Sequence, residues 1–515
     1  HDYVFQLTNW TSRAEGRQEF NAARETIDPQ KEPSLYGYAS RYSDYVLSNP
    51  KELQLLRTAY ANYYLGLNIK SAAVNLTQSV TMTLSNMFRY VNNPLPIWTR
   101  AHKNAIRYLA NKNAFEKSDP ELHEALKTAL QDGQISEQVR RELSGKTRGG
   151  KELPLIKHSM ILFDGAERLN RAGAFMSAYE IAKRQGMKQA DRITFAEKFV
   201  EETQFVYDRS NRPEWARGRK AALFTFRSFA GNMQRNFRNN LAPGRYKAAM
   251  ATLLSLGAMG GALAIPLFKE LEKAFEAAGG DPRRYMRKTF GNNWLTDIGF
   301  YGLLAPLGVN ISGPLSVSEL APDIERGLAP AVGRLALGVA ADWPQRLGKA
   351  RWLAGEMDSP YRAVETLLPE ALRSLSVAGR GMIEGWRSPD RSPLIENPTW
   401  GQIAARGMGF QPLPLSKAYE KKHSEQLLAD KSTDNKNINF RIARAIFEKD
   451  GDEVKRLLAG LANQKDLTTF VKPDREAIKN YLAGMMGLGD YVTLKRLPKK
   501  ARPEQLDIME TMGNQ

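Results

Sequence analysis

Apolar residues recur at helical spacing along much of the chain, whereas strand-type alternation is scarce. The sequence predicts one helix from near Glu214 toward Asn239 and a polar loop at Ser432–Asn437, in addition to the helices given at the end of this paragraph. The sequence therefore predicts an all-α fold, an extended multi-helix assembly with a central apolar region rich in glycine and proline. The segments with the clearest helical pattern are Glu52–Leu65, Thr77–Tyr90, Asn104–Lys112, Leu122–Leu130, Ser159–Arg184, Ile193–Tyr207, Trp400–Met408, Leu415–Asp430 and Asn439–Leu461.

Changes in composition divide the chain into four predicted regions. An N-terminal helical region covers residues 1–145 and is followed by a basic, glycine-rich linker. Because the first residue is His1 and no signal peptide pattern follows it, we expect the chain to be part of a longer polypeptide. The other three regions are a basic helical region at 152–247, an apolar Gly/Pro-rich region at 248–395 and a C-terminal helical region at 396–515.

One long apolar run, Ala248–Phe268, has 21 consecutive positions without a charge. A helix of this length would cross a hydrocarbon core of about 30 Å, so residues 248–268 are a candidate membrane helix. Gly257 and Gly261 have the GxxxG spacing that lets two helices approach closely. The run is only moderately hydrophobic, and a helix buried in an oligomeric core would look similar. The residues expected to face lipid or pack between helices are Leu253, Leu254, Gly257, Gly261, Leu263 and Ile265.

The residues just before this run form the most arginine-dense stretch of the chain. It contains a single acidic residue, Glu214, and phenylalanines are interleaved with its cations. Basic side chains contact phosphates without reading sequence, while aromatic rings stack on bases or pack in a core. The stretch is interpreted as a contact surface for nucleic acid or anionic lipid, or as an ordinary basic helix with buried phenylalanines. The candidate contact residues are Arg209, Arg212, Arg217, Arg219, Lys220, Arg227, Arg235, Arg238, Arg245 and Lys247.

The composition indicates which partners the charge favours and excludes several kinds of functional site. The formal net charge is +18, which favours polyanionic partners. The absence of cysteine excludes disulfides, thiolate metal sites and cysteine nucleophiles. No two of the five histidines have metal-ligand spacing, and no nucleophile elbow or dinucleotide fingerprint is present. The sequence therefore predicts no catalytic residue, no metal site and no cofactor.

Two polar segments interrupt the apolar pattern of the helices. In the first, Asn75 and Gln78 are placed to bridge helices through amide hydrogen bonds. In the second, Arg168 and Arg171 are placed to clamp carboxylates. The alternative is that all four are structural polar residues of the core.

The same two segments belong to a longer resemblance. NIKSAAVNLTQ at 68–78 is followed by FDGAERLNRAGAFMSAYEIAKRQG at 163–186, VEETQFVYDRSNRP at 200–213, LFTFRSFAGNMQRN at 223–236 and MGFQPLPLSKAYE at 408–420. In this order the segments resemble a module of very large internal proteins of tailed bacteriophages, which in prophages are called PLxRFG-domain or large polyvalent proteins. The resemblance covers about residues 50–425, and the PLxRFG hexapeptide itself is absent.

The resemblance implies an internal virion, or ejection, protein that is packaged in the capsid core near the portal. Such proteins are delivered into the host envelope and help to form a conduit for the genome. The implied partners are other copies of the chain, other core, ejection or portal proteins, packaged DNA, and the host membrane after ejection. No catalytic motif of the family falls on these residues, so this segment is expected not to be an enzyme. The alternatives are a noncatalytic scaffold region of a giant virion-carried transglycosylase or RNA polymerase polypeptide, and a cellular membrane-associated scaffold.

Overall fold

The computed structural model describes most of the chain as helix. Within the described residues there are only two short two-stranded sheets, which confirms the predicted all-α class. Two compact units are present, His1–Ile265 with Ile298–Pro412 and Pro266–Asp297 with Leu413–Gln515. The described residues are 18–47, 52–132, 134–135, 158–205, 214–222, 227–265, 268, 272, 282–291, 293–311, 342–388, 392–462, 474–486, 495–502 and 506.

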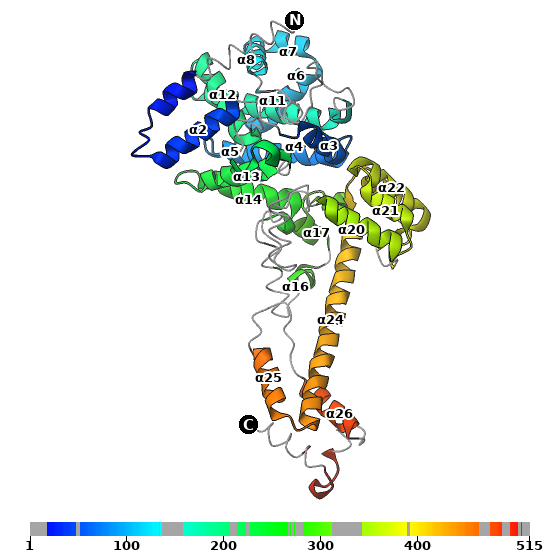
Figure 1. Ribbon diagram of the computed structural model, residues 1–515. Helices are drawn as coiled ribbons and strands as arrows, with labels where there is room; N and C mark the ends of the chain where they lie inside the picture. Colours follow the sequence, from blue (N-terminus) through cyan, green and yellow to red (C-terminus); the bar gives the residue numbers. More distant parts are fainter. Residues whose placement is uncertain are drawn as a thin grey trace. The chain divides into compact units, whose positions relative to one another are not determined.

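The first unit contains most of the helices (Figure 1). Its α-helices are α2 (Pro33–Leu47), α3 (Gln54–Leu65), α4 (Ile69–Gln78), α5 (Ser85–Met87), α6 (Leu95–Ala110), α7 (Lys112–Ser118), α8 (Pro120–Gln131), α11 (Ile161–Arg184), α12 (Gln189–Gln204), α13 (Arg227–Asn240), α14 (Tyr246–Gly260), α20 (Asp342–Gly355), α21 (Pro360–Leu367), α22 (Glu370–Glu384) and α23 (Trp400–Gly407). Its shorter elements are the π-helical turn η1 (Ser79–Leu84), the 3-10 turns η2 (Glu214–Ala216), η3 (Gly218–Ala222), η4 (Ala262–Ala264) and η5 (Ala305–Leu307), and the strands β1 (Val309–Asn310), β2 (Trp386–Arg387), β3 (Pro393–Ile395) and β4 (Gln411–Pro412). Strand β1 pairs antiparallel with β4, and β2 with β3.

Short polar side chains begin several of these helices. The side chain of Asn111 accepts the backbone N–H of Ala114 at the start of α7, and Asp119 accepts that of Leu122 at the start of α8. Helix α23 has a capping box, in which Thr399 and Gln402 each bind the other's backbone N–H. These bonds satisfy donors that have no partner inside the helix, so the sequence itself sets these helix starts.

Helix α11 forms the centre of the first unit, where it packs against α4, α6 and α12 (Figure 1). Small residues on α11 let its neighbours come close. A Cβ on Gly173 would lie 2.4 Å from Nε2 of His102 on α6. The large side chains of Phe175 and Ile181, with Phe199 of α12, fill the remaining space and are almost fully buried. Because α11 is buried around most of its circumference, it has no polar face of the kind that a surface helix presents.

The second unit has a smaller core. Its helices are α16 (Pro282–Phe290), α24 (Leu413–Phe447), α25 (Gly451–Ala462), α26 (Arg475–Met485) and the 3-10 turn η9 (Lys499–Ala501), while α17 (Trp294–Tyr301) begins in this unit and ends in the first. Ile442, Leu457, Ile478 and Leu482 pack together where α24, α25 and α26 meet.

Several predicted boundaries are wrong, among them that of the helix Asn104–Lys112, which runs across Asn111 between α6 and α7. The polar loop expected at Ser432–Asn437 is part of the continuous helix α24, since it contains neither glycine nor proline to end a helix. The helix expected over Asn439–Leu461 is broken between Phe447 and Gly451, where Lys449 has a positive φ of 58°. The helix expected from Glu214 corresponds to α13, which begins at Arg227, whereas Glu214–Ala216 and Gly218–Ala222 form the 3-10 turns η2 and η3.

The apolar run at 248–268 is not one helix, so the candidate membrane helix predicted there is shorter than expected. Helix α14 ends at Gly260, and Gly261 follows with φ 71° and ψ −172°, a conformation that only glycine adopts readily. No helix among the described residues is both long enough and apolar enough to cross a membrane.

Candidate functional site

The predicted basic contact residues fall into three groups. Arg209 and Arg212 lie outside the described residues, and Arg227 begins α13 with a side chain that is also outside them. Arg217 is half-buried between η2 and η3 and contacts tyrosines. The other six are exposed on η3, on α13 and at the start of α14, and they are called the basic surface below: Arg219, Lys220, Arg235, Arg238, Arg245 and Lys247.

Arg217 packs against a row of tyrosines on α2. Its guanidinium carbon lies 5.5 Å from the ring centroid of Tyr38, 5.0 Å from that of Tyr42 and 5.2 Å from that of Tyr45. A guanidinium over aromatic faces at this range is attracted by their quadrupoles. Nearby, Arg41 of α2 forms an ion pair with Glu214 at 2.9 Å. These contacts join α2 to a segment about 180 residues later in the chain.

The tyrosine row was missed in the sequence, although it has a visible signal. Tyr38, Tyr42 and Tyr45 are spaced by four and three residues, which places them on one face of a helix. The contact of these tyrosines with Arg217 could not be predicted from the sequence, because η2 and η3 are too short to give a periodic pattern.

Helix α13 presents arginines on one side and buries amides on the other. Arg235 and Arg238 are exposed, whereas Asn236 and Asn240 are buried, and Met233 packs in a small core with Leu256 of α14. The buried positions are three to four residues apart, which is the spacing of a helix that packs against the rest of the first unit through one face. The orientation of α13 therefore determines which way its arginines point.

A buried amide network holds α13 in this orientation. The Asn86 side chain on α5 donates to Oδ1 of Asn236 at 3.1 Å, and Asn240 donates to Oδ1 of Asn86 at 3.1 Å. Arg89 donates to Oδ1 of Asn240 at 2.7 Å and to Oε2 of Glu202 at 2.5 Å. Because an unpaired buried amide is costly, these hydrogen bonds stabilise α13 in the orientation that the structure shows.

Helix α14 carries the last two cations and the packing residues predicted in the apolar run. Arg245 and Lys247 are exposed, and Nζ of Lys247 donates to Oδ1 of Asn92 at 2.9 Å. Leu253 is half-buried, whereas the side chain of Leu254 is exposed. The side chain of Leu263 lies outside those that the structure describes.

The close approach expected at the GxxxG pair occurs within the chain. A Cβ on Gly257 would lie 3.3 Å from Cδ1 of Ile265, which is tighter than ordinary contact, so the flexible end of Ile265 would have to shift by a few tenths of an ångström. A Cβ on Gly261 would lie 2.1 Å from the carbonyl carbon of Phe300, and one on Gly302 would lie 2.0 Å from the carbonyl oxygen of Met259. Two segments of backbone therefore cross here, each through a glycine.

The two polar segments quoted for the resemblance build contacts between helices. Gln78 donates to the carbonyl of Thr203 at 3.1 Å, as expected for an amide bridge. The bridge expected from the Asn75 amide is not made: its side-chain nitrogen is buried without a hydrogen-bond partner among the described residues, and only its backbone carbonyl accepts, from Asn170 at 2.7 Å. Arg171 is completely buried and forms an ion pair with Glu167 at 3.2 Å, so it pairs with a carboxylate as a structural polar residue of the core, which was the alternative stated for it. Arg171 also donates to the carbonyls of Gln204 and Phe205, at the C-terminal end of α12. Arg168 is exposed.

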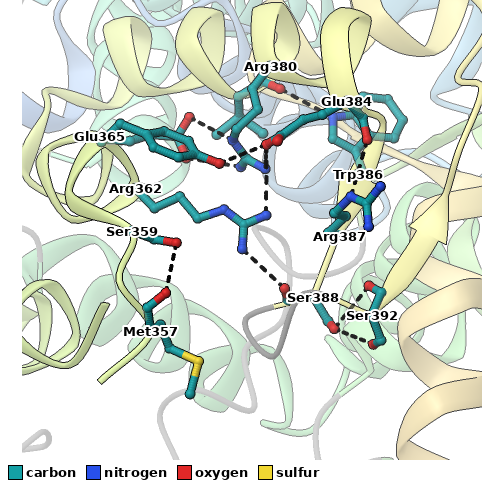
Figure 2. Close-up of polar contacts among 12 residues, drawn as sticks. Met357, Ser359, Arg362, Glu365, Arg380, Glu384, Trp386, Arg387, Ser388 and Ser392 are labelled. Carbon is teal, nitrogen blue, oxygen red and sulfur yellow. Dashed lines mark hydrogen bonds and ion pairs between the residues drawn. The ribbon is translucent and has the colours of Figure 1, made fainter. Parts of the chain in front are cut away.

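A second charged cluster, on α21 and α22, was not predicted from the sequence (Figure 2). Arg380 bridges Glu365 at 3.0 Å and Glu384 at 3.6 Å. Arg362 lies 4.0 Å from Glu384 and donates to the carbonyl of Ser388 at 3.3 Å. The two arginines and two glutamates balance each other's charge, so the cluster joins α21 to α22 and to the end of β2 rather than presenting charge to a ligand.

One serine and one histidine are paired as a nucleophile and a base would be. Ser79 on η1 donates to Nε2 of His102, and Nδ1 of His102 lies 2.9 Å from the carbonyl oxygen of Trp98. Ser79 is 4 % exposed, and its Oγ also accepts the indole N–H of Trp98 at 3.0 Å. A hydroxyl enclosed in this way does not meet a substrate, so the pair is a core contact between η1 and α6. Among the described residues, no group of acidic or histidine side chains is arranged to hold a metal ion.

No protein-family model, curated protein or solved structure matches this chain.

Proposed function

We propose that the chain is a segment of an internal virion protein of a tailed bacteriophage. In this proposal it is packaged in the capsid core near the portal, beside other copies of itself and other core, ejection and portal proteins. It is delivered into the host envelope with the genome, where it helps to form a conduit. The support from the sequence is the ordered set of segments between about residues 50 and 425, and this segment is proposed to have no enzymatic activity.

The observation that carries the proposal is the basic surface. All six of its side chains are exposed, and none forms an ion pair with an acid among the described residues. The sequence from 215 to 269 contains no aspartate or glutamate, so no acid nearby in the chain offsets this charge. A fixed set of unneutralised cations attracts phosphates, which packaged DNA supplies at high density.

The amide network also supports DNA contact through the basic surface. It buries Asn236 and Asn240 and thereby keeps Arg235 and Arg238 on the opposite, outward side of α13. Cations held by a rigid helix lose little freedom when they bind a phosphate backbone. The basic surface is thus suited to lie along DNA without reading its sequence.

Salt dependence of DNA binding tests the electrostatic part of the proposal. If about four to six phosphates are contacted, the slope of log K against log salt is about −4 to −5. The variant R235Q/R238Q removes two exposed cations and is expected to reduce the slope by about two. The matched control K103Q/R107Q removes two exposed cations from α6 and is expected to leave the slope unchanged. Binding without salt dependence, or an equal effect of the control, would contradict DNA contact through this surface.

Mass spectrometry of purified virions tests the location. Peptides of this chain should be present in particles and should stay protected from protease until the capsid is opened. Their absence from intact virions would overturn the assignment to an internal virion protein.

A further inference from the structure

Helix α14 is apolar on two opposite faces, and only one of them is covered. Ala248, Thr252, Leu256 and Gly260 are buried and follow each other at four-residue spacing. This face packs on η1 and α5, where Ser255 also hydrogen-bonds Ser85 at 3.2 Å. A helix that buries one apolar face ordinarily presents a polar one to water.

The opposite face of α14 is a row of exposed apolar side chains. Tyr246 is 62 % exposed, Met250 53 % and Leu254 68 %, and Ala258 is exposed as well. Their four-residue spacing places them above one another on the helix, about 200° around from the buried row. These four residues are called the exposed stripe below.

Further exposed apolar side chains follow in the segment that meets the end of α14. The backbone N–H of Leu303 donates to the carbonyl of Ala258 at 2.8 Å, which brings the segment after α17 against the last turn of α14. Leu303 is 52 % exposed and Leu307 is 76 % exposed. The crossing of Gly261 with Phe300 brings the two segments of backbone together at this point.

Basic residues border the exposed stripe. Arg245 and Lys247 flank Tyr246 at its beginning, and both are exposed. Arg238 is exposed on α13, which packs against α14, and the whole stretch from 215 to 269 lacks acids. Exposed apolar side chains beside lysine and arginine are the composition of elements that lie in the interface of an anionic bilayer.

We propose that the exposed stripe binds the surface of an anionic lipid bilayer, with α14 parallel to the membrane plane. In this arrangement Met250 and Leu254 enter the boundary between headgroups and acyl chains, Tyr246 lies at headgroup level, and Arg245 and Lys247 contact lipid phosphates. The opposite face of α14 stays packed on η1 and α5, so binding requires no unfolding. The inference rests on the proposed function only in that delivery brings the protein to an envelope.

Charge favours a bilayer over a second copy of the chain as the occupant of this face. A second copy would bring two basic, acid-free segments together, and no acid in either segment would offset their repulsion. An anionic bilayer neutralises the same cations while it removes the apolar side chains from water.

Vesicle flotation of the full chain tests the proposal. The protein should float with vesicles of phosphatidylcholine and phosphatidylglycerol and should bind pure phosphatidylcholine at least about tenfold more weakly. The variant M250Q/L254Q should lose at least about tenfold in partitioning onto the anionic vesicles. The matched control L372Q/L375Q replaces two leucines of α22 that are 53 % and 60 % exposed, and it should float as the wild type does.

Three results would overturn the inference. These are absence of flotation with anionic vesicles, equal flotation of M250Q/L254Q, and a wild-type dimer by light scattering that M250Q/L254Q converts to a monomer. The last result would assign the exposed stripe to a second copy instead. All substituted side chains are exposed, and a melting temperature equal to that of the wild type verifies that each variant folds. DNA binding should survive in M250Q/L254Q, whereas loss of DNA binding in R235Q/R238Q concerns only the proposed function.

Discussion

The backbone of Gly261 crosses that of Phe300 so closely that a Cβ on Gly261 would lie 2.1 Å from the carbonyl carbon of Phe300. Gly261 also has a positive φ of 71°, so both its conformation and its surroundings require glycine. We expect Gly261→Ala to lower the free energy of unfolding by about 3 kcal/mol or more. Denaturant unfolding followed by circular dichroism measures the loss.

Gly257 provides the matched control for this prediction. It occupies the other position of the GxxxG pair, and its nearest neighbour is the flexible end of Ile265 at 3.3 Å. Gly257→Ala is expected to stay within about 1 kcal/mol of the wild type, since alanine favours the helix that the contact slightly opposes. Equal effects of the two substitutions would contradict the backbone crossing.

The buried pair of Arg171 and Glu167 gives a second prediction. Arg171→Met removes an ion pair and the donors to Gln204 and Phe205, and it leaves the Glu167 carboxylate buried without its cation. We expect the free energy of unfolding to fall by about 3–5 kcal/mol. Adding Glu167→Gln to this variant should restore part of the loss, and the double-mutant cycle should give a coupling of at least about 1 kcal/mol. Strictly additive effects would show that the two side chains do not interact.

The contact of Arg217 with the tyrosines of α2 gives a third prediction. Arg217→Ala should raise amide hydrogen exchange across Pro33–Leu47 about fivefold, because a cation–π contact of this kind contributes about 1 kcal/mol. Arg219→Ala removes an exposed arginine two residues away and should leave exchange in α2 unchanged. Protection of α2 that is insensitive to Arg217 would mean that other contacts hold the helix.

A fourth prediction concerns pH. Burial lowers the pKa of His102 below the usual value of 6.5, so the native state binds this proton less readily than the unfolded state. The free energy of unfolding is then fully present above about pH 7 and falls as the pH drops through 6.5, by at most about 1.4 kcal/mol per pH unit. His102→Gln should remove this dependence between pH 7.5 and 5.5, whereas His158→Gln at an exposed position should retain it. Urea unfolding at several pH values provides the measurement.

Local pattern was enough to predict the helical class and most of the helices in the first unit. The core positions of α6, α8 and α11 repeat at helical spacing. The cap at Asn111 was missed, because the predicted helix Asn104–Lys112 runs across the point where α6 ends and α7 begins. Other errors lie where tertiary contacts decide the outcome. Gly261 ends α14 in the middle of an apolar run, because its neighbour Phe300 lies about 40 residues further along the chain.

The candidate site could be predicted only in part for the same reason. The density of arginine before α14 is plain in the sequence, but the separate role of Arg217 depends on tyrosines of α2. The outward orientation of Arg235 and Arg238 depends on Asn86, which no spacing rule connects with α13. The exposed stripe could not be separated from the buried face of α14 by hydropathy, since both faces are apolar.

The burial of α11 has a mechanical consequence. Helix α2 is held mainly by side-chain contacts such as those of Arg217, whereas α11 is packed by α4, α6 and α12 together. When the chain is pulled from its N-terminal end, α2 is expected to detach at lower force than α11, which is packed by three helices. The resistance of the first unit to pulling is thus expected to depend mainly on this central helix and the three helices packed on it.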